Sequence, residues 1–289
     1  MTKMPDFFII GAPKCGTTAM AHWLSEHPRV FMSPVKEPHH YNTDMDYVLT
    51  PARDRYEKLF SGANGKHLAV GEASTWYMYS RAAVPAILAD NPGARFIAML
   101  RNPSDMAHSL YTHNVWGGDE PVGDFIAAWG LSEQRVAGMP RHAYQHACLL
   151  GDQMERLCSL APPERVCVVL LDDVVRDTLA EYRRVLDFLG VEYDGRTDFP
   201  VKNAAKKRRL PALGRGLFRA DRVLKAAKRK LGVEAEFGAL RAVNRLNSRR
   251  ASRERPGMEA LGMMRRSFSG QVDKLEELLD RDLGHWRED

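Results

Sequence analysis

The chain has 289 residues, of which 44% are hydrophobic and 27% are charged, a balance typical of a folded, water-soluble protein with a large core. It contains no stretch of the roughly 18 apolar residues that a membrane-spanning helix needs, and residues 1–6 lead into an apolar run without the pattern of a signal peptide. The four cysteines lack metal-type pairing and dense disulfide spacing, so we expect a protein of the reducing cytoplasm. The formal net charge of +5 is modest.

Apolar runs and helix-like segments alternate along the first two thirds of the chain. Strands are predicted at residues 7–10, 68–70, 96–100 and 166–171. Helices are predicted at residues 19–26, 53–59, 81–90, 103–111 and 178–189, and the helical pattern returns at residues 258–286. Because this alternation builds parallel strands that are buried on both faces, we expect an α/β fold with a parallel sheet flanked by helices. We expect one domain over residues 1–289, with a mainly helical, basic C-terminal part.

The first predicted strand runs into a loop with two glycines and then into a helix start, Gly11-Ala12-Pro13-Lys14-Cys15-Gly16-Thr17-Thr18. This strand–loop–helix arrangement directs backbone N–H groups and the helix dipole at an anion. A P-loop nucleotidase carries a lysine directly after the second glycine, whereas this chain has Thr17 there and its lysine earlier, at Lys14. The loop is P-loop-like and predicts an anion site that differs from a magnesium–triphosphate site. The alternative is a plain strand–turn–helix corner.

A second candidate anion site follows the strand at residues 96–100. Arg101 stands at the end of this strand, Pro103 can begin a helix, and Ser109 lies two helical turns further on. The guanidinium offers a forked set of donors to a phosphate and the serine adds a hydroxyl. Alternatively, Arg101 pairs with a carboxylate at the strand end. Both anion sites lie at the carboxyl ends of parallel strands, where open α/β sheets bind their ligands.

These two motifs, in this order, resemble the 5′-phosphosulfate loop and the 3′-phosphate site of sulfotransferases that use 3′-phosphoadenosine 5′-phosphosulfate (PAPS). The resemblance covers residues 5–205 and the segment 279–286, and it is closer to the carbohydrate (heparan-type) enzymes and their bacterial relatives than to the cytosolic phenol and steroid enzymes. It implies a transferase that moves a sulfuryl group from PAPS to an acceptor hydroxyl, or less readily an amine, by in-line displacement. It also implies that adenosine 3′,5′-bisphosphate is the product and that no metal takes part.

The resemblance further implies which residues bind the nucleotide. Lys14 would stabilise the departing phosphate, residues 16–18 would hold the 5′-phosphate, and Arg101 with Ser109 would hold the 3′-phosphate. Residues 202–203 lie in what looks like the late loop that closes over the nucleotide. The full set of implied nucleotide-binding residues is Lys14, Cys15, Gly16, Thr17, Thr18, Arg101, Ser109, Lys202 and Asn203.

An acceptor hydroxyl must lose its proton as it attacks sulfur, so the site needs a base within hydrogen-bond reach. The run Lys36-Glu37-Pro38-His39-His40 resembles the heparan-type loop whose glutamate is the catalytic base, which implies that role for Glu37. His39 and His40 are rivals, because unperturbed histidine titrates near neutrality. Glu72 is a further rival, at the next predicted strand, where heparan-type enzymes often have Glu-Lys but this chain has Ala73.

Residues 202–250 are strongly basic, with 16 lysines and arginines against three acidic residues. Apolar residues interleave with basic ones over residues 213–225, as in a basic amphipathic helix. We therefore expect a basic helical segment within the domain that docks the enzyme on an anionic lipid surface or an acidic acceptor. No pattern in the sequence identifies the acceptor among carbohydrates, lipids and small natural products, and no nucleic-acid partner is expected.

Two other functions remain open to this sequence. A nucleotide kinase or ATPase is favoured by the apolar strand at residues 166–171 followed by Asp172 and Asp173, which could hold magnesium like a Walker B strand. The missing lysine after Gly16 argues against it. A binding module for an anionic surface would use only the basic segment and would leave both anion sites without a role.

Overall fold

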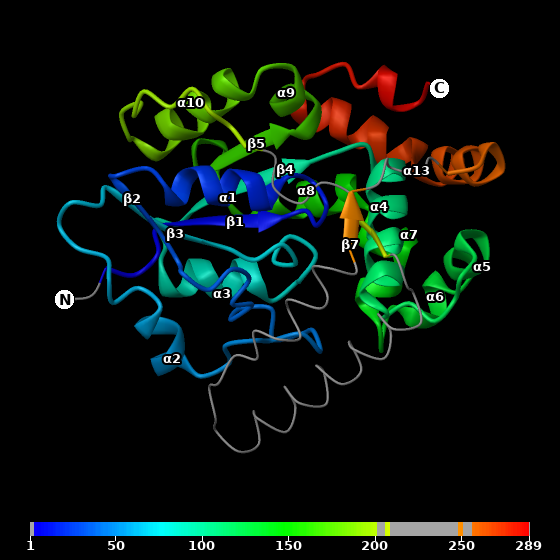
Figure 1. Ribbon diagram of the computed structural model, residues 1–289, viewed down its shortest axis with the longest axis horizontal. Coiled ribbons are helices and arrows are strands. Elements are labelled where there is room, and N and C mark those ends of the chain that lie inside the picture. Colours follow the sequence, from blue (N-terminus) through cyan, green and yellow to red (C-terminus); the bar gives the residue numbers. More distant parts are fainter. Residues whose placement is uncertain (1–2, 201–205, 209–247, 251–255, 289) are drawn as a thin grey trace.

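The computed structural model describes residues 3–200, 206–208, 248–250 and 256–288 (Figure 1). Its centre is a five-stranded parallel sheet in the order β2-β3-β1-β4-β5. The strands are β1 (Phe7–Gly11), β2 (Val30–Met32), β3 (Ala69–Ala73), β4 (Arg95–Leu100) and β5 (Val166–Leu170). The predicted α/β fold with a parallel sheet is thereby confirmed, and each of the four predicted strands is present.

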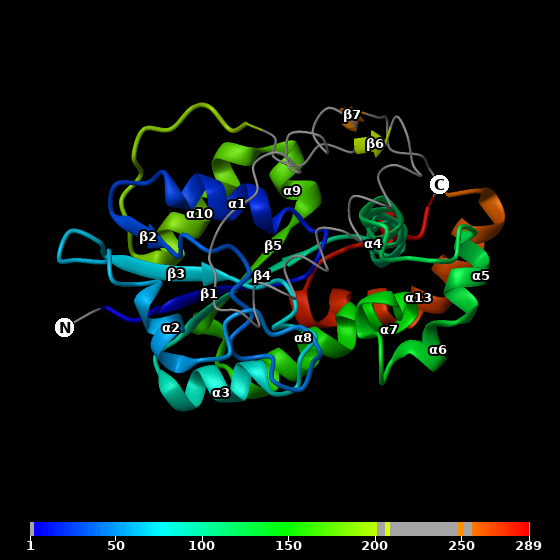
Figure 2. The same cartoon turned by 60° about the horizontal axis from the view of Figure 1, so that its bottom comes forward.

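Helices cover both faces of this sheet. Figures 1 and 2 show α1, α9 and α10 over one face and α3 and α8 over the other. The α-helices are α1 (Thr17–Ser25), α2 (Arg53–Lys58), α3 (Ala83–Asp90), α4 (Pro103–Gly117), α5 (Phe125–Gly130), α6 (Ser132–Arg135), α7 (Tyr144–Ala147), α8 (Leu150–Leu160), α9 (Leu171–Arg176), α10 (Thr178–Leu189) and α13 (Met258–Leu279). The short 3-10 helices are η1 (Pro140–His142), η2 (Pro163–Arg165) and η3 (Gly284–Trp286).

The position of each strand in the sheet explains its sequence. Every residue of β1 and β3 is buried, because each strand lies between two others and under helices on both faces. β2, which the sequence does not predict, lies at the edge of the sheet. Two of its three residues are only half-buried, so the segment has neither the length nor the continuous apolar pattern of a central strand.

Helix ends follow local capping chemistry. α10 begins after Asp177, whose side chain accepts a hydrogen bond from the first turn, and it ends at Gly190, which has a left-handed φ of 68°. These bounds match the predicted helix at residues 178–189. α4 is capped by the side chain of Asn102 and continues to Gly117, beyond its predicted end at residue 111.

The C-terminal helix α13 packs against α8 and α4. Its buried apolar side chains recur at helical spacing: Met264, Phe268, Val272 and Leu275. Beyond it, Arg281 pairs with Asp173, and the indole N–H of Trp286 donates to Asp172 at 2.5 Å. The C-terminal segment is therefore fixed to the end of β5.

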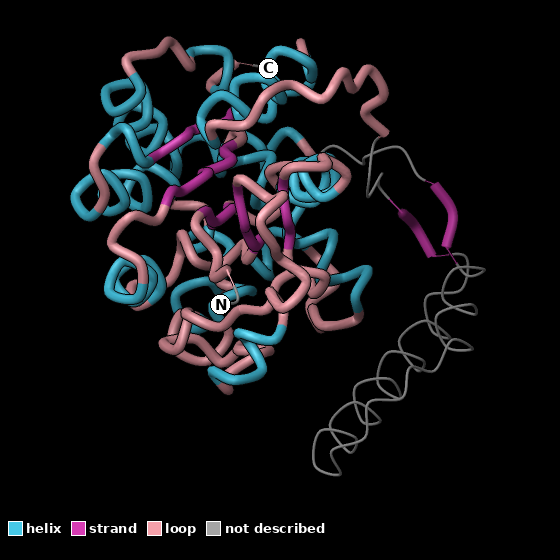
Figure 3. Tube along the Cα trace, turned by 90° about the vertical axis from the view of Figure 1, so that its left-hand side faces the viewer, coloured by secondary structure: helices cyan, strands magenta, loops and turns pink. Residues whose placement is uncertain are grey.

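Two short strands, β6 (Lys206–Arg208) and β7 (Ser248–Arg250), form an antiparallel pair that is separate from the main sheet (Figure 3). Residues 209–247, which make up most of the predicted basic helical segment, lie outside the described residues. Within the part of the chain that the structure describes, no helix has the length and apolar character needed to cross a membrane.

Candidate active site

The loop after β1 is shaped by two glycines with left-handed backbone angles. Gly11 has a φ of 145°, and a Cβ atom there would lie 2.7 Å from the carbonyl oxygen of Thr75. Gly16 has a φ of 90° and forms the N-cap of α1. Because Gly16 supplies no capping side chain, the first N–H groups of α1, at Thr17 and Thr18, lack a side-chain cap. The start of this helix suits an anion.

Lys14 and Cys15 lie in this loop but in different surroundings. Lys14 is half-buried and has a left-handed φ of 67°. Cys15 is fully buried, and its Sγ lies 3.8 Å from the Sδ of Met106 on α4. Burial raises the pKa of the Cys15 thiol to about 12, although the positive charges of Arg101 and Lys14 oppose this shift. The thiol is therefore neutral, and it joins the loop to α4 while only the backbone of Cys15 is left for a ligand.

Arg101 stands at the end of β4 with a side chain that is only 7% exposed. Its Nε and Nη2 donate to Asp105 in the first turn of α4, so the pairing with a carboxylate is present. Its Nη1, however, is buried without a hydrogen-bond partner among the described residues. Because an unsatisfied buried donor costs free energy, a ligand oxygen at this atom would be favoured. Ser109 is half-buried on α4, two turns further on.

The sheet order and α4 bring the two anion-binding groups together. β1 and β4 are neighbours, and the N–H of Ala12 donates to the carbonyl of Met99 at 2.7 Å. The contact between Cys15 and Met106 then fixes α4 beside the loop. Because residues three, four and seven positions apart share a helix face, Ser109 lies on the same side of α4 as Met106. The loop and Arg101 are thus held at the ends of adjacent strands.

Glu37 lies in the loop after β2, with a left-handed φ of 59°. Its N–H donates to the carbonyl of Ala73 at the end of β3 (2.9 Å), and its side chain is 27% exposed. The carboxylate is paired with Lys36 and lies 3.5 Å from the Nε2 of His39, which is fully buried. Burial alone would raise the pKa of Glu37, but the nearby His39 ring and the charge of Lys36 outweigh it and lower the pKa to about 2. Glu37 is therefore ionised at neutral pH.

Glu72 lies within β3 and is fully buried. It accepts hydrogen bonds from the hydroxyls of Ser74 (2.6 Å), Tyr77 (2.8 Å) and Tyr56 (3.0 Å). Burial raises the pKa of Glu72 to about 7, although these donors favour the charged form. Ser74 and Tyr77 also accept hydrogen bonds from the backbone N–H groups of residues 39–41. Glu72 thus supports the loop that carries the first base candidate.

One cationic and one aromatic side chain near Glu37, those of Arg141 and Tyr47, were not predicted from the sequence. The guanidinium of Arg141, in η1, lies over the ring of Tyr47, with its Cζ 4.4 Å from the ring centroid. The Tyr47 ring in turn lies 4.7 Å, centroid to centroid, from the ring of His39. Both residues lie in segments without helical or strand periodicity, and no sequence signal connects them to the base loop.

His113 on α4 is a third residue that the sequence analysis did not single out. Its side chain is exposed, yet the surrounding protein and the charge of Lys14 lower the pKa of His113 to about 4. The charges of Glu37 and Arg141 also act on its ring. A sequence signal did exist here, since His113 follows Ser109 by four residues and shares its helix face.

The structure does not show the other residues that the sequence singled out in this group of side chains at the strand ends. Lys202 and Asn203 lie outside the described residues. Asp172 accepts from Trp286, and Asp173 pairs with Arg281, so these acids hold the C-terminal segment. The part of the chain that the structure describes contains no cluster of three or more His, Cys, Asp or Glu residues that could hold a metal ion.

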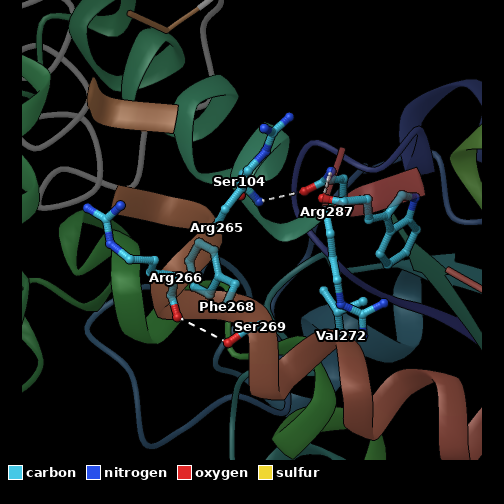
Figure 4. Close-up of a pocket in the computed structure, with 9 residues that line it drawn as sticks. Ser104, Arg265, Arg266, Phe268, Ser269, Val272 and Arg287 are labelled. Atoms are coloured by element: carbon cyan, nitrogen blue, oxygen red, sulfur yellow. Dashed lines mark hydrogen bonds between the residues drawn. The ribbon is translucent and has the colours of Figure 1, made fainter. Parts of the chain in front are cut away.

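A cavity of about 310 Å³ lies between the start of α4 and the middle of α13 (Figure 4). Its lining includes Arg265, Arg266 and Arg287. Arg287 already pairs with Asp273 and Glu276 of α13, and Arg265 donates to a carbonyl near the C-terminus. Since two of its three arginines are committed to the C-terminal segment, we place the candidate active site at the strand ends and not in this cavity.

The chain is similar to sulfotransferases in sequence and in structure. The family model described as sulfotransferase domain matches residues 4–208. A crystal structure of a sulfotransferase from Alicyclobacillus acidocaldarius is similar over 99% of this chain and 100% of its own, with a TM-score of 0.74 and 26% identity. The human bifunctional heparan sulfate N-deacetylase/N-sulfotransferase 2 is 26% identical over 207 residues, which are 65% of this chain and 22% of that protein. Human carbohydrate sulfotransferase 15 is 28% identical over 152 residues, 38% of this chain and 27% of that protein. The chain spans about a quarter of the length of these two curated relatives.

Proposed function

The chain belongs to the sulfotransferase domain family and is an enzyme that transfers a sulfuryl group; on this premise we propose that it takes the group from PAPS, bound across the two anion sites. The observation that carries the proposal is the buried, unpartnered Nη1 of Arg101 beside a helix start without a side-chain cap. A nucleotide with phosphates at both the 5′ and the 3′ position offers one anion to each. Residues 16–18 would bind the 5′-phosphate, and Arg101 with Ser109 the 3′-phosphate.

When bound, PAPS supplies a sulfuryl group on a phosphate leaving group. Lys14 would stabilise the negative charge that builds on this phosphate during an in-line displacement. Glu37 would accept the proton of the acceptor, because its carboxylate is partly exposed whereas Glu72 and His39 are fully buried. Its pairing with Lys36 and its contact with His39 would hold the carboxylate in place.

We propose a hydroxyl of a carbohydrate, a lipid or a small natural product as the acceptor, with an amine as the alternative that the name of the human N-sulfotransferase suggests. One domain is proposed for residues 1–289, supported by the packing of α13 on α8 and by the pairing of Arg281 with Asp173. The four cysteines are free thiols, which supports the cytoplasmic location that we propose. Peripheral membrane contact through the basic segment stays a prediction, and liposome sedimentation at low salt tests it.

The nucleotide proposal is tested by calorimetric titration of the full chain. Adenosine 3′,5′-bisphosphate should bind about 10- to 100-fold more tightly than adenosine 5′-monophosphate, because only the former places a charged acceptor at Arg101. Arg101→Gln should abolish this difference. Arg55→Gln, an exposed change on α2, is the matched control and should leave it intact.

Two results would contradict the proposal. Tighter binding of magnesium–ATP than of adenosine 3′,5′-bisphosphate would favour the kinase alternative. Equal affinity for the two adenosine nucleotides in the unmodified chain would remove the 3′-phosphate role of Arg101. Transfer of labelled sulfuryl from PAPS to a panel of acceptor classes then identifies the acceptor.

A further inference from the structure

Arg141 is held in place by a buried polar cluster. Its carbonyl accepts a hydrogen bond from Nδ2 of Asn114 on α4 (3.0 Å), and the carbonyl of the adjacent His142 accepts from Nη1 of Arg135 (3.3 Å). Arg135 forms a forked pair with the buried carboxylate of Glu120, at 2.8 and 3.0 Å. A forked, charge-assisted pair of this kind fixes geometry as well as adding stability. The backbone of η1 is therefore anchored beside α4.

The side chain of Arg141 is connected to the proposed base by three successive contacts. Its guanidinium stacks on the Tyr47 ring at 4.4 Å, the Tyr47 ring lies 4.7 Å from the His39 ring, and Nε2 of His39 lies 3.5 Å from the Glu37 carboxylate. Stacking on an aromatic face leaves the edge of a guanidinium, with its N–H groups, available to a ligand. Arg141 thus presents a planar donor group in the neighbourhood of Glu37.

Among the described residues, the guanidinium of Arg141 has no carboxylate to pair with. Across the described ranges, no carboxylate lies within ion-pair distance of the guanidinium, and no hydrogen bond from it is formed. Glu37 is already paired with Lys36 and lies beside His39. Lys14 and Arg141 both act to lower the pKa of His113, while the charges of Glu37 and Asp119 act in the opposite direction. A half-buried guanidinium that forms no ion pair with the protein favours an anionic ligand.

We propose that Arg141 binds a carboxylate of the acceptor while the hydroxyl to be sulfated lies against Glu37. The planar fork of arginine matches the two oxygens of a carboxylate, and the anchored backbone of η1 keeps the fork in position. This inference rests on the proposed function, and it narrows the acceptor to hydroxyl compounds that carry a negative charge. Arg141 is thus a residue that determines acceptor specificity.

The test uses pairs of acceptors that differ in one group. A sugar pair (4-nitrophenyl glucuronide and 4-nitrophenyl glucoside) and a phenol pair (4-hydroxyphenylacetate and its amide) are sulfated by the full chain with labelled PAPS. The carboxylated member should show about a 10- to 100-fold higher kcat/KM, and Arg141→Gln should reduce this ratio to about one. Arg183→Gln is the matched control, because Arg183 also stacks on a tyrosine (Tyr193, 4.2 Å) but lies on α10.

The outcomes separate this inference from the proposed function. A preference for the neutral members, or a ratio that Arg141→Gln leaves unchanged, overturns the role of Arg141 while sulfuryl transfer itself stands. If no member of either pair is sulfated, ligand-observed NMR with adenosine 3′,5′-bisphosphate present measures binding of each pair directly, and equal binding overturns the inference. Failure of adenosine 3′,5′-bisphosphate to bind at all contradicts the proposed function instead.

Discussion

Lys14 and Arg101 both carry a positive charge at the end of a strand, but the proposed mechanism gives them different effects. Lys14 acts on charge that develops only in the transition state, so Lys14→Ala should lower kcat by about 10²- to 10³-fold. Arg101 binds a phosphate that does not change during the reaction, so Arg101→Ala should mainly raise the KM for PAPS. Steady-state kinetics at varied PAPS separates the two patterns. Equal small effects in both variants would argue against these roles.

Glu37 sets the pH dependence of the proposed proton transfer. Its pKa is lowered to about 2, so the ionised, proton-accepting form persists above that pH and is lost only as the pH falls through about 2. The profile of kcat/KM should therefore show no acidic limb from this group between pH 5 and 8, the range bounded by the usual stability of proteins. Glu37→Gln should lower kcat by about 10²- to 10⁴-fold, whereas Glu57→Gln, on the exposed face of α2, should not.

A limb with a midpoint near 7 would contradict this assignment. Burial raises the pKa of Glu72 to about 7, so such a limb would point to this rival. Loss of the limb in Glu72→Gln would identify Glu72 as the base.

At the scale of elements, β3 and the base loop form one hydrogen-bonded unit. The hydroxyl of Tyr77 donates to Glu72 and accepts from the N–H groups of His40 and Tyr41. Among the described residues, the hydroxyl of Tyr56 forms a hydrogen bond with Glu72 alone. Tyr77→Phe and Tyr56→Phe should each cost about 0.5–1.5 kcal/mol of stability. Only Tyr77→Phe should also lower kcat, by about tenfold or more, because it frees the loop that positions the base.

Thermal unfolding and steady-state kinetics of both variants check this expectation. Adenosine 3′,5′-bisphosphate affinity should be unchanged in each, because the anion loop and Arg101 lie on other strands. An equal loss of kcat in Tyr56→Phe would mean that general destabilisation, and not the position of the loop, accounts for the effect.

Sequence reasoning succeeded where local chemistry decides the structure. Asp177 and Gly190 mark the ends of α10, and continuous apolar runs mark the buried strands, so these elements and the family were predicted correctly. β2 is too short and too exposed for such a pattern. The contact of Arg141 with Tyr47 joins two segments that lie far apart in the chain. The backbone that carries Arg141 is held by the buried ion pair of Arg135 with Glu120, which no local sequence pattern predicts.

At the scale of the whole molecule, the strand order determines which groups can meet. Lys14 follows β1, Arg101 follows β4, and Glu37 follows the edge strand β2. Since parallel strands direct their carboxyl ends to one edge of the sheet, the groups that follow them gather there. The burial of Glu72 and the pairing of Lys36 with Glu37 could not be read from this order, because they depend on side-chain packing between the strands.

A substitution of Asp173, one of the two acids that follow β5, tests whether these acids have a structural role or bind magnesium. Asp173 is buried and pairs with Arg281 and Arg176, so Asp173→Ala should lower the free energy of unfolding by about 1.5–3 kcal/mol. Asp187→Ala, at an exposed position on α10, should have little effect. Below the unfolding transition, kcat should stay within about twofold of the unmodified value, since a change in stability of this size leaves most molecules folded. Calorimetric unfolding together with turnover measured with and without EDTA checks both expectations. A loss of turnover without a loss of stability, or inhibition by EDTA, would instead mean that these acids hold a metal ion needed for catalysis.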